Sequence, residues 1–110
     1  YLFDGEGNVI TLESTSPPLG VVDDRDVPCG PKTAVPPGGI LLLMTDGLIE
    51  TAGPSGQHFG LERVFEVVKA NRRKSATEIV DSLYAAVERF RGTGRREDDL
   101  TVVVVKRDEG

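Results

Sequence analysis

The sequence predicts an α+β domain in which an antiparallel sheet is covered by two helices. Two apolar segments of strand length, 40–45 and 100–106, stand on either side of a stretch with helical periodicity, 60–91. Strands followed by two helices and a returning strand are typical of a layer in which helices cover one face of a sheet. A chain of 110 residues is long enough for one domain, and we assign residues 1–110 to it.

The first third of the chain is punctuated by turn residues. Apolar residues 1–3 and 9–12 flank Asp4-Gly5-Glu6-Gly7-Asn8, a segment that suits a hairpin turn. We therefore interpret Asp4 as a turn residue and not as a ligand. Ser16-Pro17-Pro18 then breaks the chain, and Pro36-Pro37-Gly38-Gly39 forces a turn before the strand at 40–45.

The middle of the chain predicts two amphipathic helices. Apolar residues at positions i, i+3, i+4 and i+7 from Leu61 predict a helix over 60–71. Ser75 and Glu78 have the spacing of a capping box, which marks the start of a second helix that ends before Gly92. The apolar stripe of this second helix consists of Ile79, Val80, Leu83, Ala86, Val87 and Phe90.

Both long strands are apolar at nearly every position, as expected of strands that are covered on both faces. Two helices cover only one face of the sheet. The apolar residues on the other face are therefore expected to be covered by a part of the protein outside this chain or by a second copy. The chain begins at Tyr1, without an initiator Met and within a predicted strand, and we interpret it as a piece of a longer protein. For the isolated chain we expect self-association through the uncovered face.

Carboxylates stand at the ends of both long strands. Asp46 directly follows the strand at 40–45, and Asp98 and Asp99 directly precede the strand at 100–105. If the strands are antiparallel neighbours, these acids lie at the same edge of the sheet; if they are parallel, they lie about 20 Å apart. Clustered carboxylates beside an apolar core are costly unless a cation compensates them, so we predict a metal site.

Each of these acids also has a structural interpretation. Asp46 is a favoured type of residue for the N-cap of a short helix at 48–50. Asp98 and Asp99, taken alone, fit a solvated loop. The metal-site hypothesis depends on Asp46 and the pair Asp98 and Asp99 occurring together in the sequence, each beside a core strand.

Composition argues against several classes of function. The net charge of −5 and the lack of a basic face argue against nucleic-acid binding. The single Cys29 excludes an internal disulfide framework, gives no zinc-ligand spacing and is not interpreted as a catalytic thiol. No apolar run approaches the roughly 20 residues that span a bilayer, so we expect no membrane contact by this segment and a cytoplasmic location.

The remaining clusters of polar residues are interpreted as solvated. Asp23, Asp24 and Asp26 lack a strand that would bury them, and the basic run Arg72-Arg73-Lys74 falls between the two predicted helices. His58, the single histidine, is assigned to a loop surface and not to general-base chemistry.

Four segments together resemble a known family. They are Pro18-Leu19-Gly20-Val21, Leu41-Leu42-Leu43-Met44-Thr45-Asp46-Gly47-Leu48-Ile49-Glu50, Gly56 with Phe59-Gly60 and Arg63, and Glu97-Asp98-Asp99-Leu100-Thr101-Val102-Val103-Val104. In this order they resemble the C-terminal half of bacterial metal-dependent protein phosphatases of the PPM superfamily (type 2C-like), in the branch typified by stage II sporulation protein E and RsbU. The resemblance covers essentially the whole chain.

The resemblance implies the C-terminal portion of an α-β-β-α sandwich, with the N-terminal half of that fold missing. It implies hydrolysis of phosphoserine or phosphothreonine by water that two Mn²⁺ or Mg²⁺ ions activate. By position, Asp46 and Asp98 match metal ligands, while Gly47 and Asp99 are given supporting roles. No catalytic residue beyond these ligands is assigned, and the resemblance identifies no substrate-binding residue.

The sequence departs from the family at one point. The upstream Asp-bearing segment that ends in Gly-His-Gly is absent. Two aspartates do not satisfy two octahedral cations, so we expect this chain alone to bind metal weakly or not at all and to be inactive. The expected partner of the parent phosphatase is a small regulatory phosphoprotein of the anti-sigma-factor antagonist type. The alternative is a non-catalytic regulatory module that retains the phosphatase fold and binds a partner.

Overall fold

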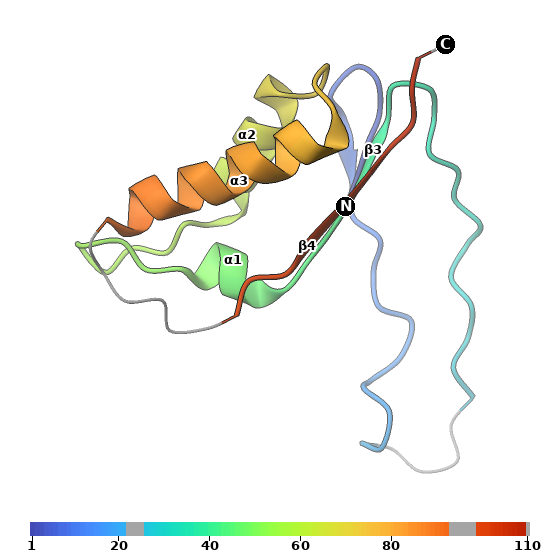
Figure 1. The fold of residues 1–110 in the computed structure, drawn as a ribbon. Helices are drawn as coiled ribbons and strands as arrows, with labels where there is room; N and C mark the ends of the chain where they lie inside the picture. Colours follow the sequence, from blue (N-terminus) through green and yellow to red (C-terminus); the bar gives the residue numbers. More distant parts are fainter. Residues whose placement is uncertain (22–25, 93–98, 110) are drawn as a thin grey trace.

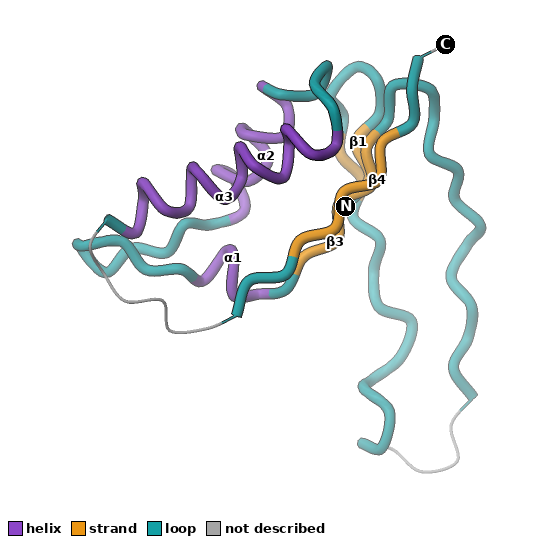
Figure 2. The backbone as a smooth tube through the Cα atoms, in the orientation of Figure 1, coloured by secondary structure: helices purple, strands orange, loops and turns teal. Residues whose placement is uncertain are grey.

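The predicted α+β class is confirmed by the structure, whose described residues form a four-stranded antiparallel sheet and three helices (Figures 1 and 2). The computed structural model describes residues 1–21, 26–92 and 99–109. The elements in chain order are β1 (Leu2–Phe3), β2 (Val9–Ile10), β3 (Ile40–Met44), α1 (Asp46–Glu50), α2 (Leu61–Ala70), α3 (Ala76–Arg91) and β4 (Val102–Lys106).

The predicted hairpin at the start of the chain is confirmed. β1 and β2 pair antiparallel, with Phe3 opposite Val9. The carboxylate of Asp4 closes the turn, because its Oδ1 accepts hydrogen bonds of 2.9 Å from the backbone amides of both Glu6 and Asn8. Asp4 is therefore a turn residue, as predicted. The strands are shorter than the predicted segments, and Thr11 already lies outside β2.

The sheet has the order β2-β1-β3-β4, so β1 and β4 flank the central strand β3. The longest ladder joins β3 to β4 in antiparallel register, from Ile40 opposite Lys106 to Met44 opposite Val102. This ladder decides between the two arrangements that the sequence left open, in favour of antiparallel neighbours. The C-terminal end of β3 and the N-terminal end of β4 consequently lie at the same edge of the sheet.

Both predicted helices are confirmed within one or two residues of their predicted ends. The Oγ of Ser75 accepts a hydrogen bond of 3.2 Å from the amide of Glu78, and this satisfies one free amide at the start of α3. Gly92 ends α3 with a φ of 67°, which a residue with a Cβ adopts only with strain. At the start of α2, Gly60 has a φ of 82° and no side-chain cap.

The two long helices cover one face of the sheet (Figure 1). Alternation along the strands separates this face from the other: Leu42 is 1% exposed, whereas its neighbour Leu43 is 50% exposed. The described residues leave the opposite face open, and the exposed Val103 lies directly across from Leu43 on it. The buried core joins the sheet to all three helices and consists of Phe3, Ile40, Leu42, Leu48, Phe59, Val64, Val68, Ile79, Leu83 and Val87.

The described residues between β2 and β3 form a long arm that contains no helix or strand and projects from the sheet (Figures 1 and 2). Its described residues, 11–21 and 26–39, are mostly exposed, and they include Leu19 at 86% and Val21 at 67%. The arm helps to explain why the radius of gyration, 15.8 Å, exceeds the about 13 Å expected of a compact chain of this length. The solvated interpretation is confirmed for Asp26; Asp23 and Asp24 lie outside the described residues.

Candidate functional site

The candidate site lies where β3 ends and β4 begins. The backbone amide of Thr45 donates a hydrogen bond of 3.1 Å to the carbonyl oxygen of Thr101, which continues the ladder one step beyond Met44 and Val102. Asp46 follows directly and starts α1. The predicted ligand Asp98 lies outside the described residues, and its pairing with Asp46 in a metal site stays a prediction.

Asp46 occupies the first turn of α1, and its side chain is exposed. The alternative in which Asp46 is the N-cap of this helix is wrong, because the N-cap position belongs to Thr45. A carboxylate in the first turn interacts favourably with the positive end of the helix dipole. The carboxylate of Asp46 is thus exposed at this edge of the sheet and does not serve as the helix cap.

Gly47 allows α1 to approach the segment that precedes β4. A Cβ placed on Gly47 would collide with the carbonyl oxygen of Asp99 and would lie 3.4 Å from Cδ2 of Leu100. The φ of Gly47 is not positive, and the residue lies within the helix. Its supporting role is therefore one of space, since any side chain would push Asp99 away from α1.

The donors at this edge fit part of a site for a hard cation. Carboxylate oxygen is the ligand type that Mg²⁺ and Mn²⁺ prefer, and Asp46 supplies it. Across residues 1–21, 26–92 and 99–109, however, no group of three or more His, Cys, Asp or Glu side chains is placed to hold a metal ion. The described residues by themselves do not complete a metal centre.

Sequence reasoning missed two hydroxyl groups at this edge. Thr45 Oγ1 accepts a hydrogen bond of 3.2 Å from the amide of Thr101, and Tyr84 in α3 donates one of 3.2 Å to the carbonyl oxygen of Leu100. No sequence pattern links Tyr84 to the predicted ligands. Thr45 directly precedes Asp46, and this adjacency was the only signal in the sequence that pointed to Thr45.

The sequence assigned His58 to a loop surface, and the structure confirms this. His58 is exposed, and its backbone forms an isolated bridge with Ala52. Phe59 beside it is buried in the core at 2% exposure, and its ring packs edge-on against Phe90. Cys29 is a free, exposed thiol on the arm.

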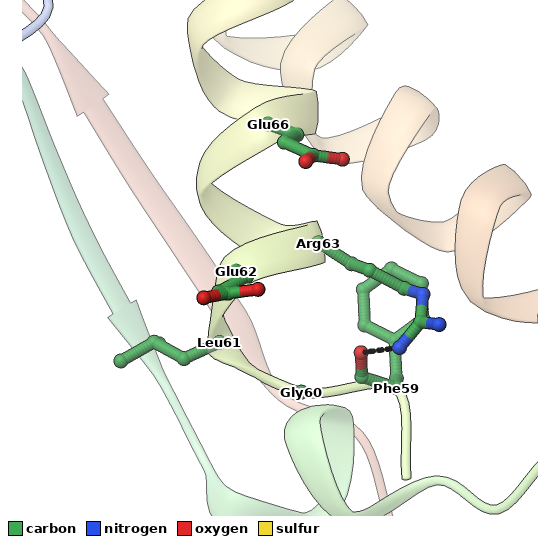
Figure 3. Close-up of a pocket in the computed structure, with 6 residues that line it drawn as sticks. All are labelled: Phe59, Gly60, Leu61, Glu62, Arg63 and Glu66. Atoms are coloured by element: carbon green, nitrogen blue, oxygen red, sulfur yellow. Dashed lines mark hydrogen bonds between the residues drawn. The ribbon is translucent and has the colours of Figure 1, made fainter. Parts of the chain in front are cut away.

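A hollow lies at the start of α2, and Asp46 is not among the residues that line it (Figure 3). Within it, two contacts hold Arg63 in place. Its Nη1 donates a hydrogen bond of 2.8 Å to the carbonyl oxygen of Phe59, and its guanidinium lies 4.6 Å from the centre of the Phe90 ring. The backbone amide of Gly60 donates a hydrogen bond of 2.9 Å to the carbonyl oxygen of Ile49, which links the start of α2 to α1. The hollow is lined by Phe59, Gly60, Leu61, Glu62, Arg63 and Glu66.

The arrangement of sheet and helices places the chain in a phosphatase-type class. The fold matches the SiaA-PP2C domain of Pseudomonas aeruginosa with a TM-score of 0.61 and 27% sequence identity, over 66% of this chain and 30% of that chain. The fold class that the sequence predicted is thereby confirmed as part of a PP2C-like domain.

The family model described as stage II sporulation protein E (SpoIIE) matches residues 1–108. The chain belongs to this family, which confirms the resemblance. It is 32% identical over 101 residues to stage II sporulation protein E of Bacillus subtilis, a match that covers 91% of the chain and 12% of that protein. It is also 27% identical over 107 residues to Protein IcfG of Synechocystis sp., covering 97% of the chain and 17% of that protein. The chain thus spans less than a fifth of the length of these two relatives.

None of the helices in the described parts of the chain combines the length and the apolar character that crossing a membrane requires.

Proposed function

We propose that this chain is part of a metal-dependent protein phosphatase domain and supplies one side of its active site. The observation that carries the proposal is the antiparallel pairing of β3 with β4, which brings the end of β3 and the start of β4 to the same edge of the sheet. In the sequence, Asp46 follows β3, and Asp98 and Asp99 precede β4. Asp46 and Asp98 are the proposed ligands of Mn²⁺ or Mg²⁺, together with donors from outside residues 1–110. Bound ions of this kind supply activated water for ester hydrolysis.

The proposed substrates are phosphoserine and phosphothreonine on a small regulatory phosphoprotein of the anti-sigma-factor antagonist type, in the cytoplasm. Membership of the SpoIIE family supports this choice. The isolated 110-residue chain is proposed to be inactive, because the described residues bring together too few ligands for even one complete metal centre.

The test is a phosphatase assay on the longest natural polypeptide that contains this chain. With Mn²⁺ present, it should release phosphate from phosphoserine and phosphothreonine peptides, whereas the isolated chain should not. Asp46→Asn and Asp98→Asn should each reduce the rate to background, because an amide oxygen is a weaker ligand than a carboxylate. Asp26→Asn, an exposed aspartate on the arm, is the matched control and should leave the rate unchanged.

A second function is favoured by one specific observation, namely the incomplete ligand group among the described residues. In that case the domain is a regulatory module that binds a partner through the retained fold. The same variants separate the two functions. A module would release no phosphate from any peptide, and its partner would bind the Asp46→Asn variant as tightly as the unchanged protein.

A further inference from the structure

The peptide group between Leu100 and Thr101 is held on both sides by hydroxyl groups from other elements. Its carbonyl oxygen accepts a hydrogen bond of 3.2 Å from the hydroxyl of Tyr84 in α3. Its amide donates a hydrogen bond of 3.2 Å to Oγ1 of Thr45, between β3 and α1. One peptide plane is thus fixed from two directions, immediately after Asp99.

The hydroxyl of Thr45 takes the place of a backbone carbonyl in the sheet. In an antiparallel ladder, opposite residues of a hydrogen-bonded pair exchange two backbone bonds. Thr45 and Thr101 make one of them, from the amide of Thr45 to the carbonyl oxygen of Thr101 at 3.1 Å. The carbonyl oxygen of Thr45 is instead used by α1, where it accepts from the amide of Leu48 at 3.3 Å. The side-chain hydroxyl therefore completes the last rung of the ladder while the backbone turns into the helix.

This use of Thr45 differs from the usual one at its position. A threonine at an N-cap normally accepts a hydrogen bond from an amide of the first helical turn. Here the side chain makes no capping bond to α1. Its hydroxyl is committed to the other strand, which links the residue before Asp46 to the residue two positions after Asp99.

A third contact fixes the same region from the helix side. Gly47 lies so close to the carbonyl oxygen of Asp99 that no side chain fits between them. The carbonyl oxygen of Gly47 accepts a hydrogen bond of 2.8 Å from the hydroxyl of Thr51, which holds this turn of α1 in place. The residues from Asp99 to Thr101 are therefore held against α1, β3 and α3.

We propose that Thr45 and Tyr84 are positioning residues that hold the described stretch before β4 against the strand end that carries Asp46. The inference rests on the proposed function, because the spacing of these two strand ends matters for metal binding only if Asp46 and the proposed ligand Asp98 bind the same ion. Misplacing a reacting group by about 1 Å costs on the order of 100-fold in rate. Two hydroxyls that fix one peptide plane at this edge are suited to prevent such a displacement.

The experiment uses the longest natural polypeptide that contains this chain. Thr45→Val removes the hydroxyl and keeps the branched shape, Thr45→Ser keeps the hydroxyl, and Tyr84→Phe keeps the ring. Thr101→Val is the matched control, since Thr101 contributes only its backbone atoms to these bonds and its side chain is exposed. The measurements are Mn²⁺ affinity by calorimetry, hydrogen exchange of the Thr101 amide without metal, and kcat and KM on a phosphoserine peptide.

Thr45→Val and Tyr84→Phe should each weaken Mn²⁺ binding about 10- to 100-fold, the range found when groups that orient metal ligands are removed. They should lower kcat at saturating peptide and leave KM nearly unchanged. Thr45→Val should also speed exchange of the Thr101 amide in the metal-free protein. Thr45→Ser and Thr101→Val should retain the affinity of the unchanged protein within about threefold.

Normal Mn²⁺ affinity in both Thr45→Val and Tyr84→Phe would overturn the positioning role, provided that Asp46→Asn abolishes binding in the same assay. A failure of the proposed function gives a different result: the unchanged polypeptide would not bind Mn²⁺, and Asp46→Asn would change nothing. Tyr84→Phe removes one oxygen atom and keeps the ring, so normal Mn²⁺ affinity in this variant overturns the positioning role of Tyr84 even if Thr45→Val does not fold.

Discussion

The carbonyl oxygen of Asp99 lies against the α-carbon of Gly47, at the place where any larger residue would begin its side chain. Gly47 follows the proposed ligand Asp46, and Asp99 follows the proposed ligand Asp98. The contact therefore joins the two strand ends that carry the candidate site, and it requires a residue without a Cβ.

Gly47→Ala should destabilise the protein. Within a helix, alanine is ordinarily favoured over glycine by about 1 kcal/mol. At this position the added methyl group must displace Asp99, and overpacking of this kind costs about 1–3 kcal/mol. Urea unfolding should show a lower midpoint for the variant.

Gly30→Ala is the control for this measurement, because a Cβ there would meet only a methyl carbon of Thr15 at an ordinary 3.6 Å. It should leave the midpoint unchanged or raise it slightly. Equal midpoints for Gly47→Ala and the unchanged protein would contradict the close approach of Asp99 to α1.

Ser75→Ala should reduce stability by about 1 kcal/mol, because the amide of Glu78 loses its hydrogen-bond acceptor at the start of α3. Ser75→Asp supplies another acceptor and should keep most of the stability. Thermal unfolding followed by far-UV circular dichroism compares the two variants, and equal losses in both would show that the cap contributes nothing.

The helices and the long strands could be predicted because local patterns specify them. Ser75 and Gly92 mark both ends of α3 in the sequence, and the apolar spacing from Leu61 identifies α2. The arm was harder to predict. Val21 lies in an apolar stretch that resembles a strand, but a strand needs a partner, and no strand of the described chain lies beside it to pair.

The candidate site was predictable only in part. The position of Asp46 at a sheet edge followed from the strand that precedes it. The contacts that hold the edge did not, because they are distant in sequence: Thr45 and Thr101 are 56 residues apart, and Tyr84 and Leu100 are 16 apart. A hydroxyl that bonds to a remote peptide group leaves no periodic or local pattern.

The β1–β2 turn should make stability depend on pH. The hydrogen bond from the Asn8 side-chain amide, together with those from backbone amides, lowers the pKa of Asp4. A carboxyl group whose folded-state pKa lies below its unfolded-state value contributes stability above the unfolded-state pKa. That contribution is lost as the pH falls through the folded-state pKa.

Asp4→Ala should therefore be less stable than the unchanged protein at neutral pH, and the difference should shrink in acid. Urea unfolding at a series of pH values measures it, with Asp26→Ala on the arm as the control. A difference between Asp4→Ala and the unchanged protein that stays constant down to strongly acidic pH would contradict the role of the carboxylate in the turn.

Metal binding by the isolated chain should be weak or absent. With few carboxylates at the edge, a cation would keep most of its water and gain little from the protein. Calorimetric titration with Mn²⁺ measures the affinity, and Asp46→Asn should remove any heat that does appear. One-to-one binding at micromolar affinity or tighter would show that this chain contains a more complete site than its described residues suggest.

The open face of the sheet leads to the last prediction, which concerns association of the isolated chain. Leu43, Val103 and Val105 are each about half exposed, at 50%, 48% and 47%. Leu43 and Val103 lie opposite each other on β3 and β4, so their side chains share this face. Soluble monomers rarely expose a contiguous apolar patch larger than a few hundred Å².

We therefore expect the isolated chain to form a dimer in which the open faces pack on each other, most simply about a two-fold axis. Val103→Lys places a charge in the middle of that face and should shift light scattering toward the monomer, because an unpaired charge is costly to bury. Ala85→Lys adds the same charge at an exposed position of α3 and should leave the dimer intact. A monodisperse monomer with a cooperative unfolding transition, seen for the unchanged chain at dilute concentration, would mean that the arm or another segment already covers this face.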